Sequence, residues 1–230
     1  YRLEPIILTF ADFNSASEQK VLEIGVGLGA DHQKFAESGA DLVGIDLTER
    51  AVNHTRARIK HFDLFSILSV GDAENLSFPD ENFDLVYSWG VLHHSPNTKK
   101  AITEVHRVLK KGGKAKIMIY HKWSMVGFML WLRYAFLMGH FWRPLSSIYA
   151  EHLESPGTKA FSVSEANDMF SCFDEVKIST HLGHGDLLES NVGQRHRGVF
   201  LKMAKQFWPR WFIRRFLTGS GLGMLIEARK

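Results

Sequence analysis

Residues 20–30 read Lys-Val-Leu-Glu-Ile-Gly-Val-Gly-Leu-Gly-Ala, and this stretch decides the fold. Its first five residues, Lys20 to Ile24, predict a short buried strand that ends at a cluster of glycines. Residues 31–38 then carry the pattern of a helix, which Gly39 ends. A strand, a tight glycine turn and a helix in this order open a parallel α/β unit.

The same alternation continues to residue 120. Further strands are expected at Asp41–Ile45, Ser66–Val70, Phe83–Tyr87 and Lys114–Tyr120. Helices are expected after the N-caps Thr48 and Ser95, and Gly112-Gly113 is expected to end the second of them. Because a parallel crossover needs a helix to return the chain, these segments predict a doubly wound α/β sheet.

The pattern changes after residue 120. Trp123 to Trp142 is rich in Met, Phe, Trp and Leu, and Gly198 to Leu217 is basic, aromatic and broken at Pro209. We expect helices in both segments. A membrane-spanning helix is not expected, because Arg133 stands near the middle of the first segment. An interfacial amphipathic helix remains the alternative to a core or lid helix.

The α/β pattern returns near the end of the chain. A helix capped by Ser164 and strands at Glu175–His181 and Gly223–Ala228 are expected there. We therefore expect one domain over residues 1–230. Its irregular parts are an N-terminal cap segment, residues 1–19, and helical insertions at 121–160 and 195–218.

The composition sets limits on the class of protein. The chain has 230 residues, of which 45% are hydrophobic, so it can bury a sizeable core. Its single cysteine, Cys172, excludes an internal disulfide, and a reduced cytoplasm is the expected compartment. Residues 195–230 carry nine Lys and Arg residues and one carboxylate. Such a tail is usually a solvated face, and contact with nucleic acid or an anionic membrane surface is the alternative.

The glycine cluster predicts a nucleotide-like cofactor. Gly25, Gly27 and Gly29 fit the dinucleotide-binding fingerprint, and Asp46 follows at the distance where an acid holds ribose hydroxyls. Glu23 stands two residues before the first glycine. Its charge suits an ammonium or sulfonium better than a pyrophosphate, which favours a cationic ligand.

The block from Glu23 to Gly29 resembles the first motif of the class I S-adenosylmethionine-dependent methyltransferases of the small-molecule type. Later blocks look like the following motifs in the same order: Gly71-Asp72-Ala73-Glu74, Leu76-Ser77-Phe78-Pro79, Phe83-Asp84-Leu85-Val86-Tyr87-Ser88, Gly90-Val91-Leu92-His93-His94 and the segment from Glu104 to Gly113. The resemblance covers roughly residues 20–120. It implies S-adenosylmethionine as cofactor and a Rossmann-like sheet that is mostly parallel with an antiparallel last strand.

The resemblance also implies which residues bind the cofactor. It places Gly25, Gly27 and Gly29 beneath the cofactor, Asp46 on the ribose, Leu47 against the adenine, and Asp72 with Ala73 at the adenine edge. Ser88, Trp89 and Gly90 would lie by the reactive methyl, with Glu23 and His93 completing the set. Leu28 departs from the family pattern, since a small hydroxyl residue is usual there.

Methyl transfer depends mainly on alignment of the reacting groups, and a base helps only if the acceptor must lose a proton. His93, His94 and His121 are the candidate bases, and His93 is preferred. The alternative is that the histidine pair only orders the loop before Ser95. No metal site is expected, because no cysteine cluster or metal-binding helix accompanies the histidines. Cys172 is expected to be a small buried residue.

The two aromatic insertions predict a lid over a small acceptor that can be lipophilic or lipid-like, with an acidic group of the acceptor met by Arg214 or Arg215. Three other functions stay open: a non-catalytic cofactor-binding protein, an RNA methyltransferase and, last, an NAD-dependent oxidoreductase. The oxidoreductase lacks support because the Tyr-x-x-x-Lys pair of short-chain reductases is missing. Nucleic acid is not the expected partner, and peripheral membrane contact is left open.

Overall fold

The computed structural model describes residues 1–189 and 205–230, and its described residues form one seven-stranded sheet. The strands are β1 (Lys20–Ile24), β2 (Asp41–Asp46), β3 (Ile67–Val70), β4 (Phe83–Trp89), β5 (Leu109–Tyr120), β6 (Glu175–His181) and β7 (Gly223–Arg229). Their order across the sheet is β3-β2-β1-β4-β5-β7-β6. Only β7 runs antiparallel to its neighbours in this sheet. The predicted fold class is therefore confirmed.

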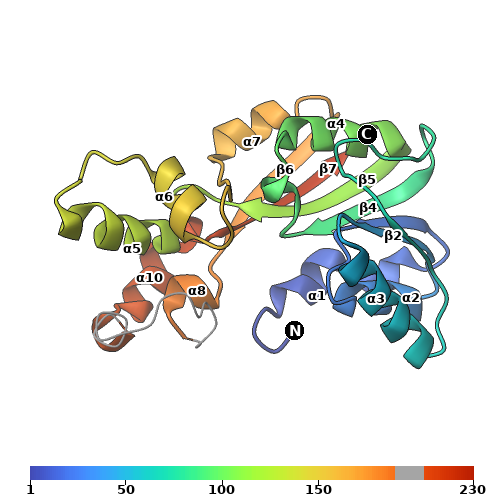
Figure 1. Ribbon diagram of the computed structural model, residues 1–230, viewed down its shortest axis with the longest axis horizontal. Coiled ribbons are helices and arrows are strands. Elements are labelled where there is room, and N and C mark those ends of the chain that lie inside the picture. The colour runs from blue at the N-terminus through green and yellow to red at the C-terminus, as the bar shows by residue number, and fades with distance from the viewer. Residues whose placement is uncertain (190–204) are drawn as a thin grey trace.

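Helices cover both faces of the sheet (Figure 1). The helices on one face are α1 (Ile6–Ala11), α2 (Ala30–Glu37) and α3 (Glu49–His61), and those on the other are α4 (Thr98–Val108) and α7 (Val163–Met169). Each face of the sheet has its own hydrophobic core, and alternate residues of β1 point into the two cores. Leu22 lies in the core that includes α4, and Val21 lies in the core that includes Phe35 of α2. Burial on both faces explains why the central strands read as continuous apolar runs.

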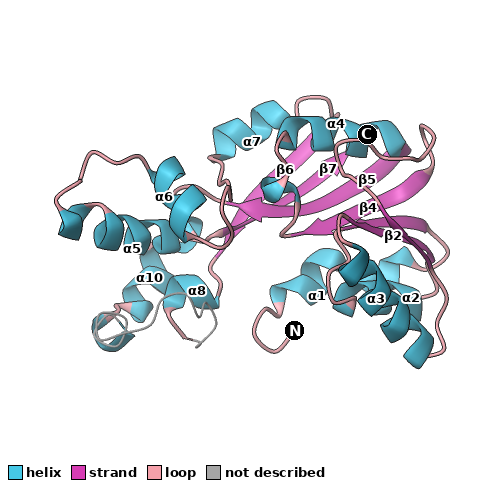
Figure 2. Cartoon of the chain, in the orientation of Figure 1, coloured by secondary structure: helices cyan, strands magenta, loops and turns pink. Residues whose placement is uncertain are grey.

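A lobe of short helices extends beyond the end of the sheet, on the left of Figure 2. It consists of α5 (Met125–Tyr134), the 3₁₀ turn η3 (Phe136–Met138), α6 (Leu145–His152), α8 (His184–Leu187) and α10 (Arg210–Phe216). Helix α5 packs on α6 around Leu130, Ile148 and Tyr149. The expected insertion at 121–160 is thus helical, whereas the part of the 195–218 insertion before residue 205 lies outside the described residues.

Three predicted element ends are wrong. Helix α4 begins after Asn97, whose side chain accepts from the Lys100 amide, because Ser95 ends the preceding 3₁₀ turn η2 (Leu92–His94). Helix α7 is capped by Ser162 through a capping box with Glu165, not by Ser164. Gly112 and Gly113 do not end a helix: β5 starts directly at Leu109, and the glycines lie in an irregularity where the pairing with β4 shifts.

The lengths and composition of the helices bear on whether the chain could span a membrane. Among residues 1–189 and 205–230, no helix combines the length and apolar content that crossing a membrane requires.

Candidate functional site

The glycine turn after β1 is built around left-handed backbone. Gly25, Gly27 and Gly29 have φ of +85°, +51° and +73°, values that glycine adopts most easily. A Cβ on Gly25 would lie 2.2 Å from a methyl of Val91, and one on Gly29 would lie 2.9 Å from Thr55. A Cβ on Gly27 would meet no atom within 4 Å. Two of the glycines therefore serve close packing, and Gly27 alone among the three borders open space where a ligand fits.

Asp46 at the end of β2 holds this turn in place. Its Oδ2 accepts from the Gly27 amide at 3.1 Å, and its Oδ1 accepts from the amide and hydroxyl of Thr48, both at 2.9 Å. A carboxylate offers about four acceptor positions, so with three of them taken one remains for a ribose hydroxyl. The structure thus places Asp46, the residue predicted to bind the ribose, directly beside Gly27.

Acidic groups surround the same turn. Glu23 is buried and lies 2.8 Å from Nδ1 of His32, whose Nε2 lies 3.0 Å from the Ser66 hydroxyl. Burial, followed by the nearby carboxylates Asp31 and Asp46, raises the pKa of Glu23, and burial lowers the pKa of His32 to about 4. The neighbouring carboxylates Asp31 and Asp46 favour a cationic ligand over a pyrophosphate. Glu23 is enclosed and its raised pKa favours the uncharged carboxyl, so Glu23 does not itself supply negative charge to a ligand.

The residues predicted for the adenine lie near the ends of β2 and β3. Leu47 has 73% of its surface exposed, and Leu28, in the glycine turn, has 69%. Asp72 is exposed, and its Oδ1 accepts from the Glu74 amide at 2.8 Å, whereas Ala73 is buried. The two exposed leucines offer apolar surface on which a flat base can lie.

The residues predicted for the methyl end differ in their accessibility. Ser88 is buried and its hydroxyl donates to the carbonyl of Ile24 at 3.0 Å, which ties β4 to β1. Trp89 packs against Phe10 at 5.9 Å between ring centroids. Gly90 has φ of +73° and turns the chain out of β4. Ser88 is placed to support the site rather than to contact a ligand.

A cluster of titratable side chains lies just beyond β4. The His93 ring is fully buried, lies 3.9 Å from the Tyr120 ring between centroids, and neither of its nitrogens has a hydrogen-bond partner among the described residues. Burial lowers the pKa of His93, so the ring is neutral. Nε2 of His94 lies 3.4 Å from a carboxylate oxygen of Glu154, to which the Tyr120 hydroxyl donates at 3.0 Å.

The segment after α6 fixes the orientation of this cluster. Ser155 and Thr158 place their hydroxyls 3.3 and 3.4 Å from Nδ1 of His94, and Lys159 donates to the carbonyls of Ser95 and Pro96, both at 2.6 Å. One ligand atom from each of His93, His94 and Glu154 lies within 4.8 Å of the others, a spacing that a metal ion could also use. The sequence did not predict Glu154, Ser155, Thr158 or Lys159 as site residues, because they belong to no recognisable motif.

The remaining candidate residues lie elsewhere. His121 is buried, with Nδ1 3.2 Å from the carbonyl of Gly221, and it is not one of the grouped ligands. His181 and His184 form no such group among the described residues. Cys172 is exposed, so the expectation of a buried cysteine is wrong: it lies in the turn after α7 rather than on the inner face of that helix.

The fold, the glycine turn and the acid after β2 are similar to those of the class I S-adenosylmethionine-dependent methyltransferases. Residues 22–117 match the methyltransferase domain family, and the resemblance seen in the sequence is confirmed. S-adenosylmethionine is the cofactor that this assignment implies. Gly27, with open space beside it, and the carboxylates Asp46 and Asp31 are chemically suited to S-adenosylmethionine, which carries a positive charge on its sulfur.

Similar proteins match about half of this chain. Phosphoethanolamine N-methyltransferase 2 of Caenorhabditis elegans is 35% identical over 51% of this chain and 27% of its own length. A demethylmenaquinone methyltransferase of Tropheryma whipplei is 33% identical over 50% of this chain and 49% of its own length. The chain thus spans half or less of the length of these relatives.

Solved structures share the fold over nearly the whole chain. YcgJ of Bacillus subtilis has a TM-score of 0.61 at 19% identity and covers 96% of both chains. An S-adenosylmethionine-dependent methyltransferase of Mesorhizobium loti has a TM-score of 0.60 at 16% identity, again with 96% of both chains covered. The likeness in fold therefore extends beyond residues 22–117.

Proposed function

We propose that this chain transfers a methyl group from S-adenosylmethionine to a small, lipophilic acceptor. The observation that carries the proposal is the meeting of two features at one edge of the sheet. Val91 touches Gly25 of the glycine turn and stands two residues before the unpartnered, buried His93. A ligand-binding turn and a cluster suited to proton transfer therefore adjoin.

The donor side is assigned to the predicted residues. The bound cofactor would supply a methyl on a positively charged sulfur, which leaves as a neutral thioether. Gly27 gives the close backbone approach, and Asp46 accepts from a ribose hydroxyl. Leu47 covers the base together with the exposed Leu28, which was not among the predicted residues. Trp89 and Gly90 border the methyl end, and the carboxylates Asp31 and Asp46 maintain the negative field. Positioning of this kind accounts for about 7–11 kcal/mol in well-oriented reactions.

The acceptor side is assigned to the histidine pair. A buried polar atom without a partner costs about 1–3 kcal/mol, and such atoms are tolerated where a ligand completes the hydrogen bond. We assign this role to His93, which would receive a hydrogen bond from the acceptor. His94 is the ring of the pair that solvent reaches, and Glu154 orients it, so His94 takes up a released proton. No metal ion is assigned to the cluster.

The acceptor class rests on the lobe. Its aromatic and aliphatic side chains include Trp131 and Tyr134, which pack against the α5–α6 core. The matched relatives include methyltransferases named for demethylmenaquinone and for 24-methylenesterol. Arg214 is paired with Glu189, which leaves Arg215 as the better candidate for an acidic group on the acceptor. A lid formed by 121–160 and 195–218 and a cytoplasmic location stay predictions.

A methyl-transfer assay tests the proposal. Purified protein is incubated with S-adenosylmethionine carrying a radiolabelled methyl and with extracts divided into polar metabolites, lipids and RNA. We expect label in a lipid or lipophilic fraction together with release of S-adenosylhomocysteine. Label in RNA would establish the RNA methyltransferase instead. Tight cofactor binding without transfer to any fraction would support the non-catalytic alternative.

Two matched variants test the histidine assignment. His94→Gln and His93→Gln should each lower turnover at least about tenfold, equal to about 1.4 kcal/mol of barrier, without changing affinity for S-adenosylmethionine. If Glu154→Gln and both histidine variants keep full turnover, the pair only orders the loop.

A further inference from the structure

We propose that the lobe binds the surface of an anionic lipid bilayer. The binding surface, here called the lobe surface, consists of the exposed residues of 136–142 and 207–217. The proposal does not depend on methyl transfer, because it rests on exposure and charge in parts of the chain outside the glycine turn.

The first observation is the exposure of large apolar side chains. Every residue from Phe136 to Trp142 is exposed, and Phe141 and Trp142 are 63% and 68% exposed. On α10 only Ile213 is buried, and Trp211 is 74% exposed. Unbroken exposed apolar runs are rare on monomeric soluble proteins and mark sites of contact with proteins or membranes.

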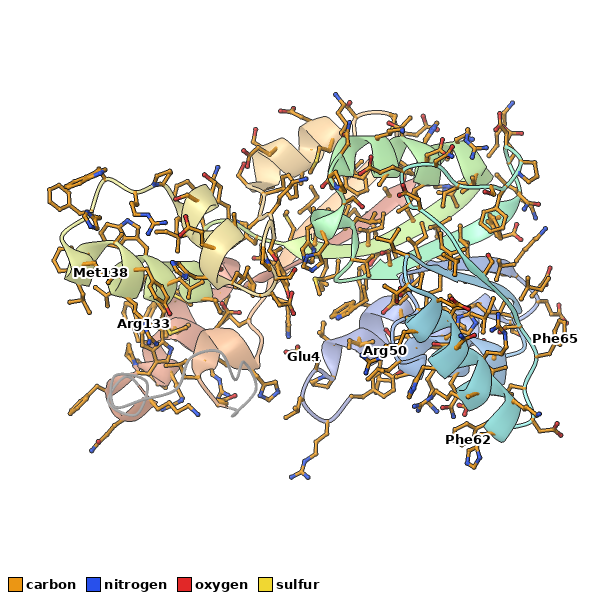
Figure 3. All side chains as sticks on the ribbon, in the orientation of Figure 1. Glu4, Arg50, Phe62, Phe65, Arg133 and Met138 are labelled. Carbon is orange, nitrogen blue, oxygen red and sulfur yellow. The ribbon has the colours of Figure 1, made fainter. Side chains whose placement is uncertain are left out.

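These exposed side chains are not part of the hydrophobic core of the lobe. The lobe already has a core of its own, formed by Leu130, Ala135, Ile148 and Tyr149. Figure 3 places Met138 and Arg133 toward the end of the lobe that lies far from the sheet. The exposed apolar residues are therefore additional to the packing that folds the lobe.

The second observation is the charge of the lobe surface. Residues 136–142 and 207–217 contain three arginines, Arg210, Arg214 and Arg215, and no Asp or Glu. Glu189 pairs with Arg214. The segments nevertheless keep a net positive charge. Aromatic side chains alternating with arginine are typical of surfaces that lie in the headgroup region of an anionic leaflet.

The two segments are fixed to a common support, so they can bind as one unit. Asp186 of α8 accepts from the Val126 amide of α5 through Oδ1, and its carbonyl accepts from the Trp208 indole at 2.9 Å. The guanidinium of Arg210 donates to the carbonyl of Leu187 at 2.9 Å. Helices α5 and α10 therefore both rest on α8. A second copy of the chain would also cover apolar residues, but two lobe surfaces of the same positive charge would repel each other.

Vesicle sedimentation tests the proposal. The full chain is mixed with vesicles of phosphatidylcholine alone or with 30% phosphatidylglycerol, at low and high salt. We expect at least about tenfold tighter binding to the anionic vesicles, weakened by salt. The double variant F141S/W142S and the single variant Trp211→Ser should each lose at least about fivefold in affinity. Phe65→Ser is the matched control, because Phe65 is 81% exposed at the opposite end of the molecule (Figure 3).

The outcomes separate the alternatives. Unchanged melting temperatures for all variants show that the changes act at the surface rather than on folding. Equal loss of binding in Phe65→Ser, or no preference for anionic vesicles, would overturn the proposal. So would light scattering that shows a dimer which F141S/W142S dissociates, with no vesicle binding by the native chain. None of these readouts uses cofactor or turnover, so failure of the proposed function would leave them unaffected.

Discussion

Gly27 is the residue at which folding and cofactor binding can be separated. Its φ of +51° makes alanine strained there by about 1–2 kcal/mol, yet a Cβ would touch no atom of the protein within 4 Å. We expect Gly27→Ala to fold and to lose at least about tenfold in affinity for S-adenosylmethionine, or about 1.4 kcal/mol. Isothermal titration calorimetry and urea unfolding measure the two effects.

Gly39→Ala is the control for backbone strain. Gly39 has φ of +83°, and the nearest atom to its added Cβ is the Ser17 hydroxyl at 3.7 Å. This variant should lose similar stability and keep its cofactor affinity. Equal affinity losses in the two variants would show that strain, and not contact with the ligand, is responsible.

The pair of Glu23 and His32 predicts a pH dependence of folding. Burial lowers the pKa of His32 from 6.5 to about 4, so its contribution to stability is present above about pH 6.5 and is lost as the pH falls toward 4. Glu23 acts with the opposite sign, because burial raises its pKa above 4.5 and its contribution is lost as the pH rises through that raised value. Glu23→Gln removes only the second effect.

We therefore expect Glu23→Gln to gain stability over the native chain as the pH rises toward 8. The free energy of unfolding of this variant should fall more steeply between pH 6.5 and 4 than that of the native chain. In the native chain the opposite effect of Glu23 partly offsets that of His32, and the variant lacks it. Urea unfolding across this pH range measures both changes. Parallel stability curves for the two proteins would contradict the assignment.

At the scale of elements, the N-cap of α4 is the sharpest test. The structure assigns the cap to Asn97, whose side chain accepts from the Lys100 amide at 3.1 Å. Asn97→Ala should cost about 1 kcal/mol, whereas Ser95→Ala should change the free energy of unfolding by less than about 0.5 kcal/mol. If urea unfolding showed a larger loss of stability for Ser95→Ala than for Asn97→Ala, Ser95 would be the N-cap, as expected from the sequence.

The element ends that were predicted wrongly share a cause. Ser95-Pro96 is a good start for a helix when read locally, but η2 comes first and uses Ser95 as its end. Gly112-Gly113 is a good helix end, but the pairing of Leu109 with Phe83 takes the chain into β5 before the glycines. Local signals locate an element, and tertiary pairing decides where it begins and ends.

At the scale of the whole molecule, the two halves of the site differ in how far sequence could predict them. The glycine turn and Asp46 are separated by a short stretch of chain and meet through adjacent strands, so their spacing alone predicts their meeting. His94 and Glu154 are brought together by a lobe whose path no periodicity specifies. Exposure of the lobe surface, likewise, is known only once α5 has packed on α6.

The most direct test of the account is a crystal structure of the chain grown with S-adenosylhomocysteine. We predict ligand density over Gly27, with a ribose hydroxyl within hydrogen-bond distance of the Asp46 carboxylate and the adenine against Leu47. Density for the ligand at any other place, or none at saturating concentration, would contradict the central claim.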